Sequence, residues 1–200
     1  MKHLTLLFMI ISFILCSCGN DKFTTEQKNY ILPDQYENLG EPGLIYIPHI
    51  SADFVTVFNP SGMKVEGKIP GGKGPCSVLI LHNGSKGYIT NFFSGDVTIF
   101  DARTNRLIKT VKTQDHPADL LEIPGTNKVL VSHESQSSID VINTNDNSVE
   151  ELKETCTGKM YYLKSSGKII VPQIFTPFIK IIDPNTLHII AQIETGGRPM

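Results

Sequence analysis

The sequence repeats itself with a period of about 42 residues, and this repeat restricts the fold more than any other feature. Residues 44–59, 86–101, 128–143 and 168–183 align at successive offsets of 42, 42 and 40 residues. A second column of residues keeps the same offsets: Pro75, Pro117, Lys159 and Pro199. Two columns that keep one register identify a structural repeat, and periods of this length are typical of propellers and solenoids.

Each period contains four segments with the composition of β-strands. In the second copy these segments are residues 76–84, 87–92, 95–101 and 105–113, and Asn83-Gly84, Ser94-Gly95 and residues 101–105 separate them as turns. No segment after residue 40 shows sustained helical periodicity. Four antiparallel strands per period predict an all-β fold, a β-propeller built from four-stranded blades. Neighbouring blades must cover the two faces of each sheet.

The second copy resembles the YVTN β-propeller repeat. Tyr88-Ile89-Thr90-Asn91 and Ile99-Phe100-Asp101 carry the resemblance best, and residues 181–199 carry the second half of the pattern. The third copy departs from the pattern, with residues 130–133 in place of the Tyr-Val-Thr-Asn stretch and Lys159 in place of the junction proline. The resemblance covers residues 44–200 and implies a relation to lactonase-like and surface-layer-like propellers. It says little of function, because propellers support unrelated activities.

The number of repeats predicts an incomplete ring. We name the strands of a blade A to D, counted outward from the ring axis. Leu44 begins a B strand, and the sequence stops at Met200, where the next A strand would begin. Lactonase-like propellers have seven blades, so we expect about four blades of a truncated seven-bladed ring. A four-bladed ring, with the preceding segment supplying a strand, is the alternative. Unpaired blade edges would allow self-association.

The first 17 residues are expected to be a lipoprotein signal peptide. Lys2 is followed by an apolar run from Leu4 to Leu15, the usual length of a signal-peptide core. Residues 15–18, Leu-Cys-Ser-Cys, resemble a lipobox, which implies that Cys18 is the acylated N-terminus. Residues 18–43 would then tether the domain to the membrane through the lipid. An ordinary secretory signal is the alternative.

The expected location is the cell envelope. Gly19 follows the lipidated cysteine, where an aspartate would mark inner-membrane retention, so an outer membrane or cell surface is favoured. In such a compartment a disulfide between Cys76 and Cys156 is permitted, although two cysteines alone do not indicate one. The 18 basic and 20 acidic residues are nearly balanced, which argues against a nucleic-acid partner.

Two columns of polar residues are expected on one face of the propeller. The junction between strands D and A and the turn between strands B and C lie at the same end of an antiparallel blade. The junctions contribute Lys73, His116, Lys159 and Arg198. The ends of the B strands contribute His49, Asn91, His133 and Gln173. These side chains would line a funnel for anionic or polar ligands. Capping of the turn is the structural alternative.

The sequence favours a non-catalytic binding module over an enzyme. It has no G-x-S-x-G, H-E-x-x-H, Walker A or C-x-x-C motif, and we expect no metal and no cofactor. A protein, a glycan or a small polar molecule would bind the propeller face. The alternative is a lactonase- or lyase-like enzyme, which requires convergence of acids and histidines such as His49, His133, Glu134 and Asp119. Cys76 would be a nucleophile only beside a base.

Overall fold

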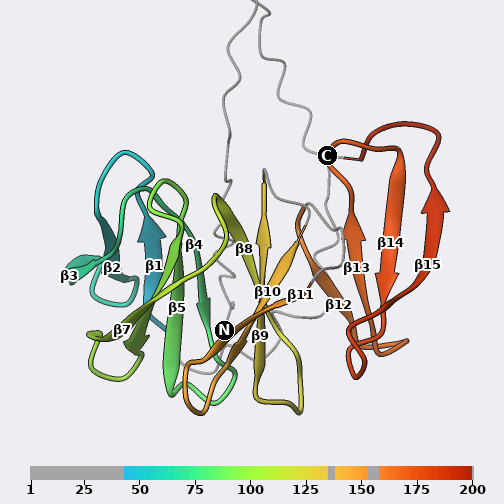
Figure 1. Cartoon of the computed structure of the whole chain (residues 1–200). Coiled ribbons are helices and arrows are strands. Elements are labelled where there is room, and N and C mark those ends of the chain that lie inside the picture. The colour runs from blue at the N-terminus through green and yellow to red at the C-terminus, as the bar shows by residue number, and fades with distance from the viewer. Residues whose placement is uncertain (1–42, 135–137, 153–157, 200) are drawn as a thin grey trace, which may run out of the picture. The chain divides into compact units, whose positions relative to one another are not determined.

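The computed structural model describes residues 43–134, 138–152 and 158–199. The expected signal peptide, Cys18, the tether and Cys156 lie outside these residues. The described chain is all-β, with 15 strands in four antiparallel sheets (Figure 1). None of its described segments forms a helix long and apolar enough to cross a membrane.

Each sheet corresponds to one copy of the repeat, and we call the sheets blades 1 to 4. Blade 1 contains β1 (Ile45–Pro48), β2 (Phe54–Asn59) and β3 (Lys64–Pro70). Blade 2 contains β4 (Pro75–Ile80), β5 (Lys86–Asn91), β6 (Asp96–Asp101) and β7 (Arg106–Lys112). Blade 3 contains β8 (Pro117–Glu122), β9 (Lys128–His133), β10 (Ile139–Asn143) and β11 (Val149–Leu152). Blade 4 contains β12 (Tyr161–Leu163), β13 (Lys168–Pro172), β14 (Phe178–Ile182) and β15 (Ile189–Glu194).

The strand order confirms the predicted blade. In blades 2, 3 and 4 the four strands pair with their neighbours in chain order. Blade 1 has three described strands, and its first one starts at Ile45, next to the Leu44 that was expected to begin a B strand. The strand order does not test whether these blades are part of a seven-bladed ring, so the seven-bladed ring stays a prediction.

The turns between strands C and D repeat the same chemistry in every blade. The side chain of Asp101 accepts hydrogen bonds from the backbone N–H groups of Arg103 and Thr104, at 2.9 and 2.8 Å. Such bonds define an Asx-turn, as the sequence predicted. Four turn residues with positive φ follow the repeat offsets: Met63, Asn105, Asn147 and Leu187.

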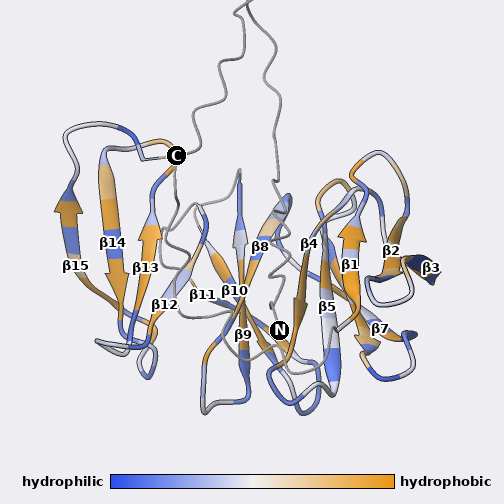
Figure 2. Cartoon of the chain, turned by 180° about the vertical axis from the view of Figure 1, so that it is seen from behind, coloured by the Kyte–Doolittle hydropathy of each residue, from blue (hydrophilic) through white to orange (hydrophobic). Residues whose placement is uncertain are grey.

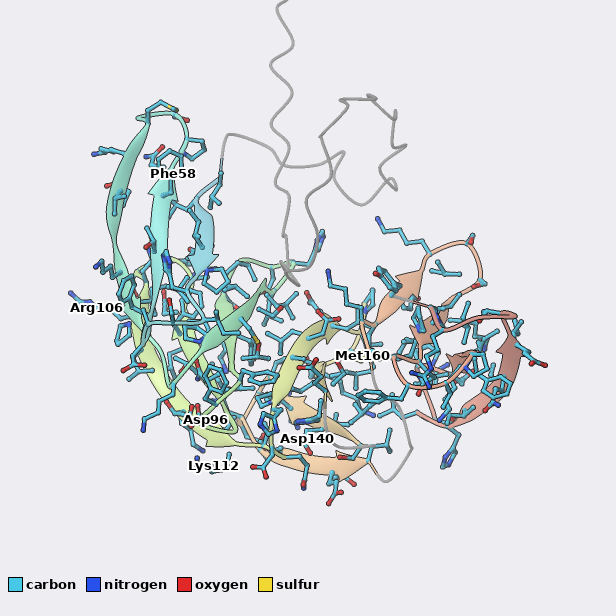
Figure 3. The ribbon with its side chains drawn as sticks, turned by 90° about the horizontal axis from the view of Figure 1, so that it is seen from above. Phe58, Asp96, Arg106, Lys112, Asp140 and Met160 are labelled. Carbon is cyan, nitrogen blue, oxygen red and sulfur yellow. The ribbon has the colours of Figure 1, made fainter. Side chains whose placement is uncertain are left out.

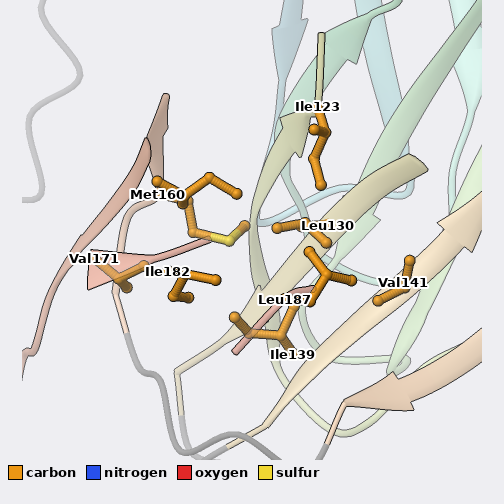
Figure 4. Close-up of a cluster of buried hydrophobic side chains, with 9 residues drawn as sticks. Ile123, Leu130, Ile139, Val141, Met160, Val171, Ile182 and Leu187 are labelled. Atoms are coloured by element: carbon orange, nitrogen blue, oxygen red, sulfur yellow. The ribbon is translucent and has the colours of Figure 1, made fainter. Parts of the chain in front are cut away.

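The hydrophobic core lies between the blades. One cluster joins blades 1 and 2, a second joins blades 2 and 3, and a third joins blades 3 and 4. In the third, Leu130 and Ile139 of blade 3 pack with Met160 and Ile182 of blade 4 (Figure 4). Each sheet therefore depends on its neighbour to cover its apolar face.

Candidate functional site

The end of each blade that carries the turn between strands B and C is called the junction end, and in blades 2 and 3 the junction residues lie there too. Pro75 lies opposite Asn91 in the β4–β5 ladder, and Pro117 lies opposite His133 in the β8–β9 ladder. The backbone N–H of Glu134 also donates to the carbonyl of His116, at 3.0 Å. The predicted juxtaposition of the two columns is therefore present in blades 2 and 3.

At the junction end of blades 1 and 2, the residue at the end of strand B is hydrogen-bonded to a polar residue of strand C. The ring Nε2 of His49 lies 2.8 Å from Thr56 Oγ1, and Asn91 Nδ2 donates to Thr98 Oγ1 at 2.9 Å. His133 and Asp140 hold the equivalent positions in blade 3. Sequence reasoning missed the strand C members, although their offsets of 42, 42 and 40 could have revealed them: Thr56, Thr98, Asp140 and Lys180.

His133 and Asp140 form a buried polar contact that holds the junction loop before blade 3. His133 Nε2 lies 3.1 Å from Asp140 Oδ2, and the side chains are 0% and 2% exposed. This nitrogen is close to the carboxylate but makes no well-aligned hydrogen bond within the described chain. His133 Nδ1 lies 3.2 Å from the Asp115 carbonyl, and Asp140 accepts from the N–H of Gln114 at 2.8 Å. The pair therefore fixes the loop (Figure 3 labels Asp140).

The structure divides the eight predicted ligand-face residues by exposure. Lys73, Lys159 and Arg198 are exposed. His49 and His116 are half-buried. Asn91, His133 and Gln173 are buried.

The buried members are engaged within their own blades, which agrees with a structural role. Asn91 Nδ2 also donates to Asp96 Oδ1 at 2.7 Å, and Gln173 Nε2 donates to the Val171 carbonyl at 2.9 Å. Whether any of the eight contacts a ligand stays a prediction.

An exposed aromatic ring stands beside the junction of blade 2. Phe93 is 62% exposed, and its backbone N–H donates to the Lys73 carbonyl at 3.0 Å. Its ring lies over Gly74, where an added Cβ would be only 2.4 Å from the ring. The ring of Phe92 packs edge-on against Phe93 and lies 4.7 Å from the ring of His116, between centroids. These side chains bring aromatic and basic groups together.

His116 occupies a backbone position that suits glycine. Its φ is +56°, and the equivalent residues in blades 2 and 4, Gly74 and Gly158, also have positive φ. Non-glycine residues rarely adopt this conformation, although histidine does so more often than most. His116 therefore carries a side chain at a position where the backbone conformation favours glycine.

Cys76 lies on the inner strand of blade 2 and contacts blade 3. Its Sγ lies 3.2 Å from Thr90 Oγ1 and donates to the Pro117 carbonyl at 3.4 Å. Burial raises the pKa of the Cys76 thiol, and the charges of Asp119 and Glu134 raise it further, while the contact with Thr90 opposes them. Cys76 therefore has the surroundings of a structural thiol rather than an activated nucleophile.

Asp119, also on an inner strand, makes a contact between blades 3 and 4. Its Oδ2 accepts a hydrogen bond from the N–H of Met160 at 2.9 Å (Figure 3 labels Met160). Burial raises the pKa of Asp119, and the Met160 bond and the charge of Lys159 act in the opposite direction. Among the described residues, no group of three or more histidines, cysteines or acids could hold a metal ion.

Searches for related sequences found neither a matching protein-family model nor a matching curated protein. The YVTN resemblance therefore has no independent support at the level of the repeat family.

Solved structures match the fold at low sequence identity. Hydrazine synthase of Kuenenia stuttgartiensis has a TM-score of 0.68 and 18% identity over 76% of this chain and 46% of that chain. The dihydro-heme d1 dehydrogenase NirN, in complex with DHE, has a TM-score of 0.67 and 14% identity over 78% and 35%. A functionally unknown protein from Desulfotomaculum acetoxidans has a TM-score of 0.63 and 17% identity over 76% and 54%.

Hydrazine synthase and NirN are β-propeller proteins, and the four antiparallel sheets of this chain form the same fold. The chain spans between about a third and a half of the length of the structures that it matches.

Proposed function

We propose that this protein is an exported, lipid-anchored β-propeller that binds a polar ligand at its junction end without catalysing a reaction. The observation that carries the proposal is the exposed Phe93 ring beside the exposed Lys73, next to Phe92 and His116. A flat apolar ring packs against the apolar face of a sugar, while a lysine attracts carboxylate or phosphate groups. An acidic glycan fits this combination best.

Three further features support a binding role. Most propeller ligand sites need a rigid scaffold, and here the backbone of Phe93 is held by the junction that carries Lys73. Blade 3 presents the imidazole of His116 where blades 2 and 4 have glycine, Gly74 and Gly158. Two of the four residues named for an enzyme, His133 and Asp119, are instead engaged in contacts that hold blades and loops together.

Binding is tested on a glycan array with the full chain, the Phe93→Ala variant and a matched Leu107→Ala control. Leu107 is also exposed, but it lies on the outer strand β7. We expect the unsubstituted chain to bind acidic glycans, the Phe93→Ala variant to lose about tenfold in affinity, and the control to bind normally. Equal binding by all three chains would contradict the assigned face. Hydrolysis of a lactone panel by the unsubstituted chain would favour the enzyme alternative.

The anchor is tested by metabolic labelling with a radioactive fatty acid in a bacterial host. The full chain should incorporate the label and sediment with membranes, and the Cys18→Ala variant should do neither. The Cys16→Ala variant is the matched control, because Cys16 has bulky Leu15 at the position that a lipobox reserves for a small residue. Labelling that depends on Cys16 rather than Cys18 would contradict the assigned cleavage site.

A further inference from the structure

Each blade uses a fixed set of positions to bury one sheet face against the next blade, and we call this its front face. In blade 2 the front face packs against blade 3 and consists of Leu79, Leu81, Tyr88, Val97, Ile99 and Val111. In blade 3 the equivalent positions pack against blade 4, and they are Leu121, Ile123, Leu130, Ile139 and Val141. These sets are related by the repeat offset of 42 residues.

The same positions in blade 4 are apolar but uncovered. The repeat offsets give Tyr161, Leu163, Ile170, Ile179, Ile181 and Ile193 as the front face of blade 4. None of them is buried. Ile193 is 51% exposed, whereas its equivalent in blade 2, Val111, is 6% exposed. Figure 2 shows β13 and β14 coloured largely as hydrophobic. The front face of blade 4 therefore has the apolar composition of an interface between blades, but no described residue covers it.

The opposite end of the array carries the complementary surface. We call the face that packs against the preceding blade the back face. In blade 3 its members include Val129, Val131, Ile142 and Val149, which pack against blade 2. In blade 1 the equivalents are Ile45, Ile47, Phe58 and Val65, and Val65 is 59% exposed. Among the described residues, one front face, that of blade 4, and one back face, that of blade 1, are thus uncovered.

We propose that the front face of blade 4 binds the back face of blade 1 in a second copy of this chain. The contact would continue an interface that the structure already builds three times between successive blades. Neither face contains a charged residue among the positions named above, so apolar burial would drive the contact. Head-to-tail interfaces close into rings when the rotation allows. Two copies of the described blades that pair in both directions would cover all four faces, and this arrangement is an alternative to the truncated seven-bladed ring expected from the sequence.

This dimer is independent of ligand binding, because it uses the sheet faces of the terminal blades and not the junction end of blade 2. It also differs from pairing through strand edges, which needs backbone hydrogen bonds rather than apolar side chains.

The test measures the protein mass of the purified full chain in detergent by light scattering during gel filtration. We expect the mass of two chains for the unsubstituted protein. Ile181→Asp places a charge on the front face and Ile47→Asp places one on the back face, so each should raise the dissociation constant at least about tenfold. The matched control is Ile108→Asp, because Ile108 is 46% exposed on the outer strand β7.

Mixing the two variants distinguishes head-to-tail from other modes of association. The Ile181→Asp chain retains an intact back face and the Ile47→Asp chain retains an intact front face, so the mixture should restore a dimer through one interface. Circular dichroism must show the same β-sheet signal for all four proteins. A single-chain mass for the unsubstituted protein at micromolar concentration would overturn the proposal. So would larger open assemblies, or a mixture in which no dimer returns although both variants are folded.

Discussion

Replacing Gly87 by valine should destabilise the protein, because the ring of Phe100 already occupies the space that a side chain would need. Gly87 on β5 lies directly opposite Phe100 on β6. A Cβ added at Gly87 would be 2.1 Å from Cζ of Phe100, far closer than real contacts allow. Phe100 is fully buried between blades 1 and 2, so its ring has little room to move away.

Blades 3 and 4 show how the same position accommodates a larger side chain, whereas in blade 1 Ile45 lies opposite a phenylalanine, Phe58, that is not buried. The equivalent cross-strand pair is Val129–Ile142 in blade 3 and Ile169–Ile182 in blade 4. In those blades a branched residue replaces the glycine and an isoleucine replaces the phenylalanine. Exchanging both residues of blade 2, Gly87→Val with Phe100→Ile, should therefore reproduce a combination that this fold already packs.

The expected free-energy changes follow from this complementarity. Gly87→Val alone should cost about 3 kcal/mol, at the upper end for overpacking, since the ring cannot move into solvent. Phe100→Ile alone should cost about 2 kcal/mol, less than the loss for truncation to alanine, because most of the buried volume remains. The double variant should be more stable than the sum of the single changes predicts, by about 2 kcal/mol.

The assay is urea unfolding of the full chain, followed by circular dichroism, for the unsubstituted protein and the three variants. Gly67→Val is a control, because a Cβ at Gly67 meets no atom within 4 Å. It should change the free energy of unfolding by less than about 1 kcal/mol. A Gly87→Val variant as stable as the unsubstituted chain, or strictly additive effects, would refute the packing described for blade 2.

Three further predictions concern buried polar groups. Asp119→Asn should raise the melting temperature at pH 7, because burial raises the pKa of Asp119 and its ionisation therefore costs stability as the pH rises through that pKa. The gain should vanish well below pH 3.8, where Asp119 is neutral in both the folded and the unfolded chain. Asp140→Ala should lower the free energy of unfolding by about 3 kcal/mol in urea titrations, since it leaves two polar groups, the buried His133 and the half-buried backbone N–H of Gln114, without Asp140. Cys76 should react with iodoacetamide at pH 7.4 at least about tenfold more slowly in the folded than in the unfolded chain, because burial raises the pKa of its thiol. Peptide mass spectrometry would measure both rates, and equal rates would contradict the placement of Cys76.

The strands could be predicted from the sequence because the same pattern of apolar segments and turn residues recurs in each copy of the repeat. Turn residues such as Asn83-Gly84 and Ser94-Gly95 separate alternating apolar segments, and each copy reinforces the register of the others. The predicted segments of the second copy agree with β4 to β7 apart from their ends. The Asx-turns were also predictable, because they depend on local sequence alone.

The burial of the polar column could not be predicted from that column alone. Asn91 and His133 end their strands, and a polar residue at such a position can point to solvent or toward the neighbouring strand. The choice depends on the partner across the sheet, Thr98 or Asp140, and on the loop that packs above it. Pairing the two polar columns by their shared offsets would have indicated internal contacts.

The aromatic surface was missed for a different reason. Phe92 and Phe93 break the polar character of the turn between strands B and C, and the sequence gives no sign of which ring faces solvent. The contact of Phe93 with Gly74 decides it, since a side chain at position 74 would clash with the ring. This contact joins two segments that are distant in the repeat and requires the folded blade.

Photo-crosslinking in intact cells tests the central claim, that the junction end of blade 2 is the binding face, most directly. A benzophenone amino acid replaces Phe93 in the full-length chain, and the same residue replaces the exposed Leu107 on the outer strand as the control. We predict adducts that depend on ultraviolet light at position 93 and few or none at position 107. No adduct at position 93, or equal adducts at both positions, would contradict the assignment of this face.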